Sequence, residues 1–258
     1  MDIAKEISVV IQGPIDDRTY EAIDHYQYFK EVIVSTWEDE DFSLLAPATG
    51  AYSIVKSKYP DDMSKVNNQG SRYFMSFTTL AGSYLAKGKY VMKTRSDELY
   101  PDLTSMLKNL EKYPDRMQTT DNGFWKKLKG AVSNHLFIEQ KKYLDEAMLR
   151  HVAFCHDSKS ELNSILNYPE QSFGFFIAKS RAGTKVSSKE VWENINSLYK
   201  KNIFVTPCRD LPGHLHSGAS AVGRGFKRSS LPYPLGRIDM HSGVHDINGL
   251  CQHIEDLP

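Results

Sequence analysis

Three polar segments of this sequence each follow a short run of apolar, mostly β-branched residues. The segments are Gln12–Pro14, Thr36–Asp39 and Arg95–Glu98. Ligands of an open α/β sheet bind outside the carboxyl ends of its strands, so these segments should line one site. A carboxylate at such a strand end can hold Mg²⁺ or Mn²⁺, and the cation can neutralise a diphosphate leaving group. A structural alternative stays open, in which Asp97 or Asp102 caps the helix that follows.

The runs that precede these segments predict the strands of a sheet. We expect strands at Ile7–Ile11, Val32–Thr36, Tyr52–Lys56 and Tyr90–Arg95. A helical pattern over 16–30, with Asp16 as its cap, separates the first two strands, and a longer one over 68–87 precedes the fourth. This order predicts an α/β fold with a Rossmann-like central mixed sheet flanked by helices.

The second half of the chain has a less regular pattern. It predicts helices near 140–149, 159–167, 169–179 and 187–200, and a strand at Ile203–Thr206, whereas a helix near 103–110 belongs to the first half. After Pro207 the pattern dissolves into a stretch rich in proline, glycine and histidine. We therefore expect a single domain over residues 1–258, with residues 207–258 as an irregular C-terminal cap of that domain.

The composition excludes several classes of protein. The chain of 258 residues carries 32 Lys and Arg against 32 Asp and Glu, so it lacks the global basic field of a nucleic-acid binder. No apolar run approaches the roughly 20 residues of a membrane-spanning helix. The N-terminus, with Asp2, Lys5 and Glu6, does not resemble a signal peptide. The 3 cysteines lack a CxxC spacing, which predicts a reduced, cytoplasmic protein.

Several motifs resemble the WavE family of lipopolysaccharide-synthesis proteins. They are Ile7–Pro14 (ISVVIQGP), Val32–Glu38 (VIVSTWE), Arg72–Ser76, Lys89–Asp97 (KYVMKTRSD), Ser133–Phe137 and Pro169–Gln171, within residues 5–180. The resemblance implies a glycosyltransferase of the GT-A fold, which uses a nucleotide-diphospho-sugar donor. It also implies a divalent cation, Mn²⁺ or Mg²⁺, held by a motif of the Asp-x-Asp type.

The sequence departs from that motif at its first acidic position. Arg95 stands there, so the resemblance carries over only Asp97 as a metal ligand. Arg95 could instead meet a phosphate directly. Glu98 is a second carboxylate, but adjacent residues of an extended chain point in opposite directions. The Ser-Asp-His of the family pattern is replaced by Ser133-Asn134-His135, which weakens any acid/base role at position 134.

The resemblance also implies which residues bind the donor. The end of the first strand should border the nucleotide base, and Glu38 or Asp39 should accept hydrogen bonds from the base or the ribose. Arg72, on the long helix, should reach the donor phosphates, with a surface salt bridge as its structural alternative. The complete predicted donor-binding set is Gln12, Gly13, Pro14, Glu38, Asp39, Arg72, Arg95 and Ser96.

Sugar transfer requires a base that takes the proton from the acceptor hydroxyl. Our candidate is Glu170, which follows Tyr168-Pro169 and opens an apolar helical stretch. A proline in the first turn places Glu170 at a helix N-terminus, where a carboxylate stays ionised. The separation of Glu170 from Asp97 along the chain also resembles that of inverting GT-A enzymes. The structural alternative is a simple N-terminal helix acid, and Asp157 is the reserve candidate.

Histidine and basic residues are frequent in the tail. They are His214, His216, His241, His245, Arg224, Lys227 and Arg228. The histidines could bind zinc or complete the coordination of the donor cation, but polar-loop histidines more often only form hydrogen bonds. The basic loop could fold over a diphosphate or simply be solvated.

The resemblance, together with these residues, implies transfer of a sugar from a nucleotide-diphospho-sugar to a glycan hydroxyl, with inversion, in lipopolysaccharide or surface polysaccharide synthesis. A lipid-linked acceptor would bring peripheral contact with the cytoplasmic face of a membrane. A sugar nucleotidyltransferase is one alternative, although residues 12–17 lack a basic phosphate loop. A non-catalytic nucleotide- or glycan-binding module is the other, favoured by Arg95. Walker, GxGxxG and GxSxG motifs are absent, which disfavours kinases, dinucleotide oxidoreductases and α/β-hydrolases.

Overall fold

The computed structural model describes residues 2–16, 18–59, 70–121, 129–213, 215–216 and 231–232. Its centre is a seven-stranded sheet with the strand order β3-β2-β1-β4-β7-β6-β8. The strands are β1 (Ile7–Gln12), β2 (Glu31–Trp37), β3 (Ser53–Ser57), β4 (Tyr90–Arg95), β6 (Met117–Thr120), β7 (Phe137–Gln140) and β8 (Ile203–Thr206). In this sheet β7 runs antiparallel to both of its neighbours, and every other pair is parallel. The expected α/β fold with a mixed sheet is confirmed.

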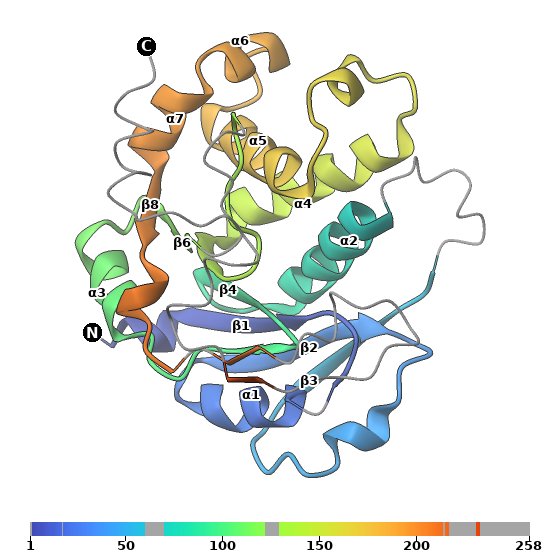
Figure 1. Cartoon of the computed structure of the whole chain (residues 1–258), viewed down its shortest axis with the longest axis vertical. Coiled ribbons are helices and arrows are strands. Elements are labelled where there is room, and N and C mark those ends of the chain that lie inside the picture. The colour runs from blue at the N-terminus through green and yellow to red at the C-terminus, as the bar shows by residue number, and fades with distance from the viewer. Residues whose placement is uncertain are drawn as a thin grey trace.

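Helices cover both faces of this sheet. They are α1 (Thr19–His25), α2 (Gly70–Leu85), α3 (Thr104–Lys112), α4 (Lys141–His156), α5 (Pro169–Ala182), α6 (Ser188–Glu193) and α7 (Ile195–Asn202). Figure 1 shows α1 beneath β1, β2 and β3, whereas α2 lies on the opposite face, with α4 and α5 stacked above it. Contacts between α2 and α4 and between α4 and α5 confirm that order of layers.

Strands β1 and β2 are buried on both faces, which explains their continuous apolar runs. Successive side chains of a strand point to opposite faces. Val10 and Ile33 therefore pack into the core beneath α2 and α4, while Val9 and Ile11 pack into the core on the α1 side. Gly82 lets α2 lie directly on the sheet, because a Cβ there would come within 2.5 Å of Val10 Cγ1.

Several boundaries differ from the expectations. The helix expected over 16–30 is α1, which begins only at Thr19 and ends in a 3-10 turn, Tyr26–Tyr28. Asp16 is not its cap residue: Arg18 occupies that position, and Asp16 Oδ1 accepts a hydrogen bond from Arg18 N. The helix expected over 159–167 is only the 3-10 turn Glu161–Ser164. The helix expected over 187–200 is divided at Asn194 into α6 and α7.

The tail contains structure that the sequence did not predict. A second sheet joins β5 (Glu98–Leu99), β9 (Leu215–His216) and β10 (Leu231–Pro232) in the order β10-β9-β5. Strand β9 is antiparallel to β5, with His216 opposite Glu98. Residues 215–216 therefore lie beside the segment that follows β4, which contains the polar residues Arg95–Glu98.

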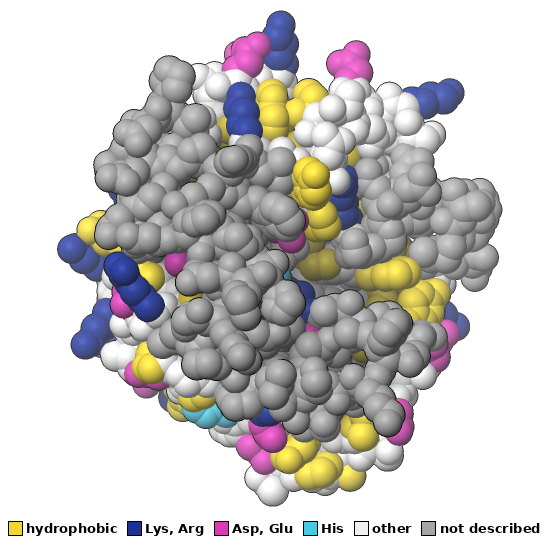
Figure 2. Space-filling model, viewed as in Figure 1, with side chains coloured by type: hydrophobic (Ala, Val, Ile, Leu, Met, Phe, Trp, Pro, Cys, Tyr) yellow, Lys and Arg dark blue, Asp and Glu magenta, His cyan; other side chains and the backbone are white. Residues whose placement is uncertain are grey.

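The charged residues of the described surface are mixed in sign. On the face in Figure 2, cationic and acidic side chains alternate around the periphery, in keeping with a net charge of zero. Among the described residues, no helix is long and apolar enough to cross a membrane.

Candidate functional site

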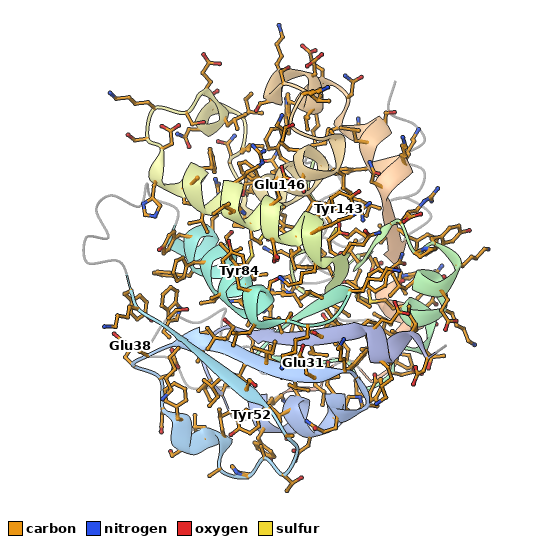
Figure 3. The ribbon with its side chains drawn as sticks, turned by 180° about the vertical axis from the view of Figure 1, so that it is seen from behind. Glu31, Glu38, Tyr52, Tyr84, Tyr143 and Glu146 are labelled. Carbon is orange, nitrogen blue, oxygen red and sulfur yellow. The ribbon has the colours of Figure 1, made fainter. Side chains whose placement is uncertain are left out.

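One edge of the central sheet collects the polar strand ends. The strands β1, β2, β3, β4, β6 and β8 share one direction, so all of their carboxyl ends lie at this edge, and β7 begins there. Seen from behind, Glu38 marks this edge where β2 ends, whereas Tyr84 and Tyr143 lie on α2 and α4 (Figure 3). Open α/β sheets bind their ligands at this edge.

The turns after β1 and β4 touch each other at Gly13 and Ser96. Gly13 has a φ of 130°, and a Cβ added there would stand 2.6 Å from Ser96 Oγ. Ser96 N donates to Gln12 O at 2.9 Å, and Thr19 Oγ1 donates to Ser96 O at 3.2 Å. Glycine is required here for both its conformation and its lack of a side chain. The structure thus brings Gln12, Gly13 and Ser96 together, with the exposed Pro14 next to them.

Arg95 and Asp97 form a bidentate ion pair at the same place. Arg95 Nε donates to Asp97 Oδ1 at 2.9 Å, and Nη2 donates to Oδ2 at 2.8 Å. Burial lowers the pKa of Arg95, but the neighbouring charges of Asp97 and Glu98 outweigh it and raise the pKa above its usual value. The guanidinium is therefore a fixed positive charge, held in orientation by both oxygens of one carboxylate.

Glu98 contacts the same guanidinium, contrary to the expectation that it points away from Asp97. Residues 96–97 form a turn between β4 and β5, so the chain is not extended there. Glu98 Oε1 lies 3.7 Å from Arg95 Nε and 2.6 Å from His135 Nδ1. Glu98 Oε2 accepts a hydrogen bond from Tyr100 at 2.8 Å. The second ring nitrogen of His135, Nε2, lies 3.5 Å from Arg95 Nη1.

The acidic and the basic side chains of this cluster differ in their exposure to solvent. The side chains of Asp97 and Glu98 are only 3% and 1% exposed, whereas those of Arg95 and His135 are 21% and 18% exposed. The carboxylates therefore lie beneath, and the basic groups reach solvent. A ligand that approaches this cluster meets N–H groups before it meets carboxylate oxygens.

This arrangement does not fit a divalent cation. Mg²⁺ and Mn²⁺ need several oxygen ligands in a nearly octahedral shell. Both oxygens of Asp97 accept hydrogen bonds from Arg95, and both oxygens of Glu98 are bound by His135 and Tyr100. In the described part of the chain, no three His, Cys, Asp or Glu side chains are grouped to hold a metal. The assignment of Asp97 as a metal ligand stays a prediction.

The segment before β7 connects this cluster with Glu170. Val132 N donates to Glu170 O at 3.1 Å, and Lys93 Nζ donates to Asn134 O at 2.5 Å. Lys93 is 1% exposed, and burial, followed by the charge of Arg95, lowers its pKa to about 7. Glu170 itself is half-buried in the first turn of α5. The 132–135 segment thus contacts the backbone of Glu170 through Val132 and the side chain of Arg95 through His135.

Arg72 lies on α2 close to Glu170. Its side chain is largely buried, and Nη1 donates to Leu166 O at 2.7 Å. Burial lowers the pKa of Arg72, while Cys155 and Glu170 act in the opposite direction. Arg72 is therefore not a surface residue, and the alternative of a surface salt bridge does not describe it. It fastens α2 to the loop that leads into α5.

Glu38 and Asp39 follow β2 and are both exposed. Glu38 N donates to Ser57 O at 2.9 Å, which joins this turn to the end of β3. The next acid along the chain, Glu40, accepts a hydrogen bond from Ile15 N at 3.2 Å. The turn after β2 is therefore fixed against the turn after β1, and the predicted base- and ribose-binding residues border the Gly13–Ser96 contact on one side.

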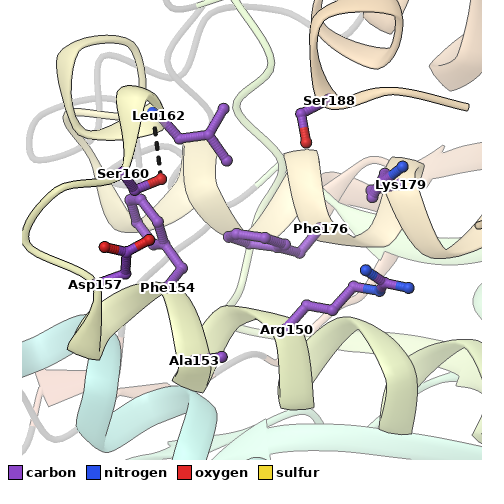
Figure 4. A pocket seen from close by; sticks show the side chains of 9 residues that line it. All are labelled: Arg150, Ala153, Phe154, Asp157, Ser160, Leu162, Phe176, Lys179 and Ser188. Atoms are coloured by element: carbon purple, nitrogen blue, oxygen red, sulfur yellow. Dashed lines mark hydrogen bonds between the residues drawn. The ribbon is translucent and has the colours of Figure 1, made fainter.

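Asp157, the reserve base, lies in a different place. It lines an open cavity of about 270 Å³ between α4, α5 and α6 in the helical layer. In Figure 4, Asp157 and Ser160 stand at one end of this cavity, with Arg150 and Lys179 at the other. Asp157 Oδ1 accepts a hydrogen bond from Lys159 N, and its backbone closes the end of α4. The structure therefore places Asp157 beside a cavity in the helical layer, whereas the backbone of Glu170 is hydrogen-bonded to the segment that contains His135.

A buried acid and a cysteine occupy the adjacent strand ends, and the sequence analysis missed both. Asp121 follows β6, and its Oδ1 accepts a hydrogen bond from Cys208 N at 2.7 Å. Burial raises the pKa of Asp121, and burial together with Asp121 raises the pKa of Cys208. Neither residue belongs to a recognisable sequence pattern, because β6 and β8 are distant in the chain.

His135 is the other residue that sequence reasoning did not select. The Ser133-Asn134-His135 stretch carried the available signal, in a histidine next to the position at which the family pattern has an acid. Of the tail candidates, only the backbone of His216 is described. The others, His214, Arg224, Lys227, Arg228, His241 and His245, lie outside the described residues.

No protein-family model and no curated protein matches this sequence. Among solved structures, glucosyl-3-phosphoglycerate synthase from Mycobacterium tuberculosis, in complex with Mn²⁺, UDP and glucosyl-3-phosphoglycerate, is 10% identical with a TM-score of 0.45, over 98% of this chain and 81% of that one. The glycosyltransferase GlyE of Streptococcus pneumoniae is 14% identical with a TM-score of 0.45, over 96% of this chain and 62% of that one. This chain thus spans less than two thirds of GlyE.

A third solved structure, CMP:2-keto-3-deoxy-manno-octonic acid synthetase with CTP, is 8% identical, with a TM-score of 0.38, over 78% of this chain and 89% of that one. These likenesses are too distant to assign a family or an activity. The resemblance to the WavE family therefore stays a prediction from the motifs quoted above.

Proposed function

We propose that this protein is a glycosyltransferase of the GT-A type that moves a sugar from a nucleotide-diphospho-sugar to a hydroxyl of a growing surface glycan. The observation that carries the proposal is the outward-facing pair of Arg95 and His135 beside the Gly13–Ser96 contact. Basic groups at the carboxyl edge of a parallel sheet, next to a glycine turn, are suited to an anionic nucleotide.

The donor lies along this edge in the proposal. Its base and ribose lie towards Gln12, Pro14, Glu38 and Asp39, where exposed carboxylates accept hydrogen bonds from ribose hydroxyls or base N–H groups. Its diphosphate lies at Arg95 and Ser96. The C1 atom of the donor sugar then faces the segment that leads to Glu170.

Glu170 acts as the base in this mechanism. The acceptor oxygen attacks the donor C1, the bond between C1 and the phosphate oxygen breaks, and the nucleoside diphosphate leaves with the bonding electrons. The proton of the acceptor hydroxyl passes to the Glu170 carboxylate. Glu170 lies in the first turn of α5, at the positive end of the helix dipole. Direct displacement inverts the configuration at C1 and forms no covalent glycosyl-enzyme.

Release of nucleoside diphosphate tests this proposal. Nucleotide-sugars with different bases are incubated with the protein and a solubilised glycan or lipid-linked acceptor, and both the nucleotide and the elongated glycan are measured. Removal of a general base typically lowers the rate by about 10²–10⁴-fold, so Glu170→Gln should lower turnover to that extent. The matched control is Glu190→Gln, because Glu190 is also a first-turn helix acid and glutamine can maintain its capping box.

Two results would contradict the proposal. Tight binding of a nucleotide-sugar without any cleavage would indicate the non-catalytic binding module. Release of pyrophosphate from a nucleoside triphosphate and a sugar phosphate would indicate a nucleotidyltransferase. Equal activity of the Glu170→Gln and Glu190→Gln variants would remove Glu170 from the mechanism.

A further inference from the structure

We propose that Arg95 and His135 bind the donor diphosphate directly, so that the protein recognises it without a divalent cation. This inference rests on the proposed function for the identity of the ligand. It differs from the expected mechanism at one point, since a guanidinium and an imidazole take the position of the metal. Asp97 and Glu98 are then positioning residues, which hold the two basic groups and do not touch the ligand.

The direction of the donors is the first reason. The carboxylates of Asp97 and Glu98 are almost fully buried, and the side chains of Arg95 and His135 are partly exposed above them. A cation would have to reach oxygens that lie behind a guanidinium of the same charge. An anion meets the N–H groups first, with no rearrangement.

The hydrogen bonds of the guanidinium are the second reason. Arginine carries five N–H donors in a rigid plane. Asp97 uses the edge formed by Nε and Nη2, and the other edge, formed by Nη1 and Nη2, has His135 Nε2 at 3.5 Å from Nη1. That edge matches two phosphate oxygens in a bidentate pair. The plane is already fixed by Asp97, so little conformational entropy is lost when the phosphate binds.

His135 extends this surface by one ring nitrogen. Its Nδ1 lies 2.6 Å from Glu98 Oε1, which orients the ring and leaves Nε2 beside Arg95 Nη1. A phosphate oxygen bound at Nη1 would therefore also lie beside the Nε2 atom of His135.

Calorimetric titration tests the inference, with inorganic pyrophosphate and UDP, GDP, CDP and dTDP as probes. Each is titrated in EDTA and, separately, in Mn²⁺. We expect at least one probe to bind in EDTA with a dissociation constant within about twofold of that in Mn²⁺, a difference below 0.5 kcal/mol by the usual conversion of about 1.4 kcal/mol per tenfold change. The free Mn²⁺ resonance in electron paramagnetic resonance should be unchanged by the protein.

Variants separate the two mechanisms. Arg95→Lys keeps the charge but loses the bidentate edge, and it should weaken binding by about tenfold or more. Arg95→Asp supplies a second carboxylate beside Asp97, and it should make binding depend on Mn²⁺. The matched control is Arg116→Lys: Arg116 precedes β6 at the opposite edge of the sheet and lies over the Tyr113 ring, so binding should not change. Melting temperatures identify variants that fail to fold.

The outcomes distinguish this inference from the proposed function. Binding that requires Mn²⁺ and disappears in Asp97→Asn overturns the inference and leaves sugar transfer in place. Binding of pyrophosphate in EDTA that Arg95→Lys weakens supports the inference, even if no sugar transfer is detected and the proposed function fails. The absence of any binding in both conditions overturns the inference.

Discussion

Arg95 holds both carboxylate oxygens of Asp97, through Nε at 2.9 Å and Nη2 at 2.8 Å, although only Ser96 separates the two residues in the chain. The turn after β4 makes this approach possible. Asp97, the acid that the motif offers as a metal ligand, is therefore already paired with the positive charge of Arg95.

Arg95→Met should lower the free energy of unfolding by about 3–5 kcal/mol, because it leaves the Asp97 carboxylate buried without its partner. In the double variant Arg95→Met with Asp97→Leu, the loss should be smaller than the sum of the single losses. Urea denaturation at neutral pH measures all three. The control is Lys189→Met, since the Lys189–Glu193 pair is exposed and should contribute less than about 1 kcal/mol. Additive losses at positions 95 and 97 would contradict the coupling.

Gly13→Ala should damage both stability and nucleotide binding. Its positive φ alone costs roughly 1–3 kcal/mol for a residue with a Cβ, and the new methyl group would also press on Ser96 Oγ. The matched control is Gly183→Ala, because Gly183 has a φ of 87° but no atom within 4 Å of an added Cβ. Both variants should lose stability in denaturation, whereas only Gly13→Ala should also weaken nucleotide binding in calorimetry.

Because Lys93 is buried, the free energy of unfolding should depend on pH in a specific way. Burial lowers its pKa from 10.5 to about 7, so between these values the unfolded chain binds a proton that the folded protein does not. The stability attributable to Lys93 should therefore rise as pH increases from about 7 to 10.5, by up to about 1.4 kcal/mol per pH unit, and it should be lowest below pH 7. The difference in unfolding free energy between the wild type and Lys93→Met, measured across this range, should show that slope. Parallel curves for the two proteins would contradict it.

Arg72 should act on the position of the loop before α5. Its Nη1 is bound to Leu166 O, and the side chain is buried, so Arg72→Met should lower the unfolding free energy by about 1–3 kcal/mol. We expect the affinity for a nucleoside diphosphate to stay within about twofold, because the side chain is directed at the protein backbone. Turnover should fall, since Glu170 follows this loop. A large loss of affinity with unchanged stability would instead support the predicted phosphate contact of Arg72.

The long apolar elements were predictable, and the short polar strands were not. Runs or periods of apolar residues in the sequence predict strands β1, β2, β3 and β4 and helix α2. Strands β6 (Met117–Thr120) and β7 (Phe137–Gln140) have only 4 residues each and contain polar side chains, yet all are buried. Their burial comes from neighbouring strands and helices, which a local pattern does not record.

The sequence by itself determined which polar residues follow each strand and, through the parallel order of the strands, that Gln12, Gly13, Arg95, Ser96 and Asp97 share one edge. Only the tertiary structure decided how these residues use their charges. The pairing of Glu98 with His135 joins residues 37 apart in the sequence. The contact of Glu98 with Arg95 depends on the turn at residues 96–97, where the sequence pattern predicted an extended chain. Hydrogen bonds and burial depend on three-dimensional neighbours, so the sequence could name the carboxylates but not reveal that basic groups cover them.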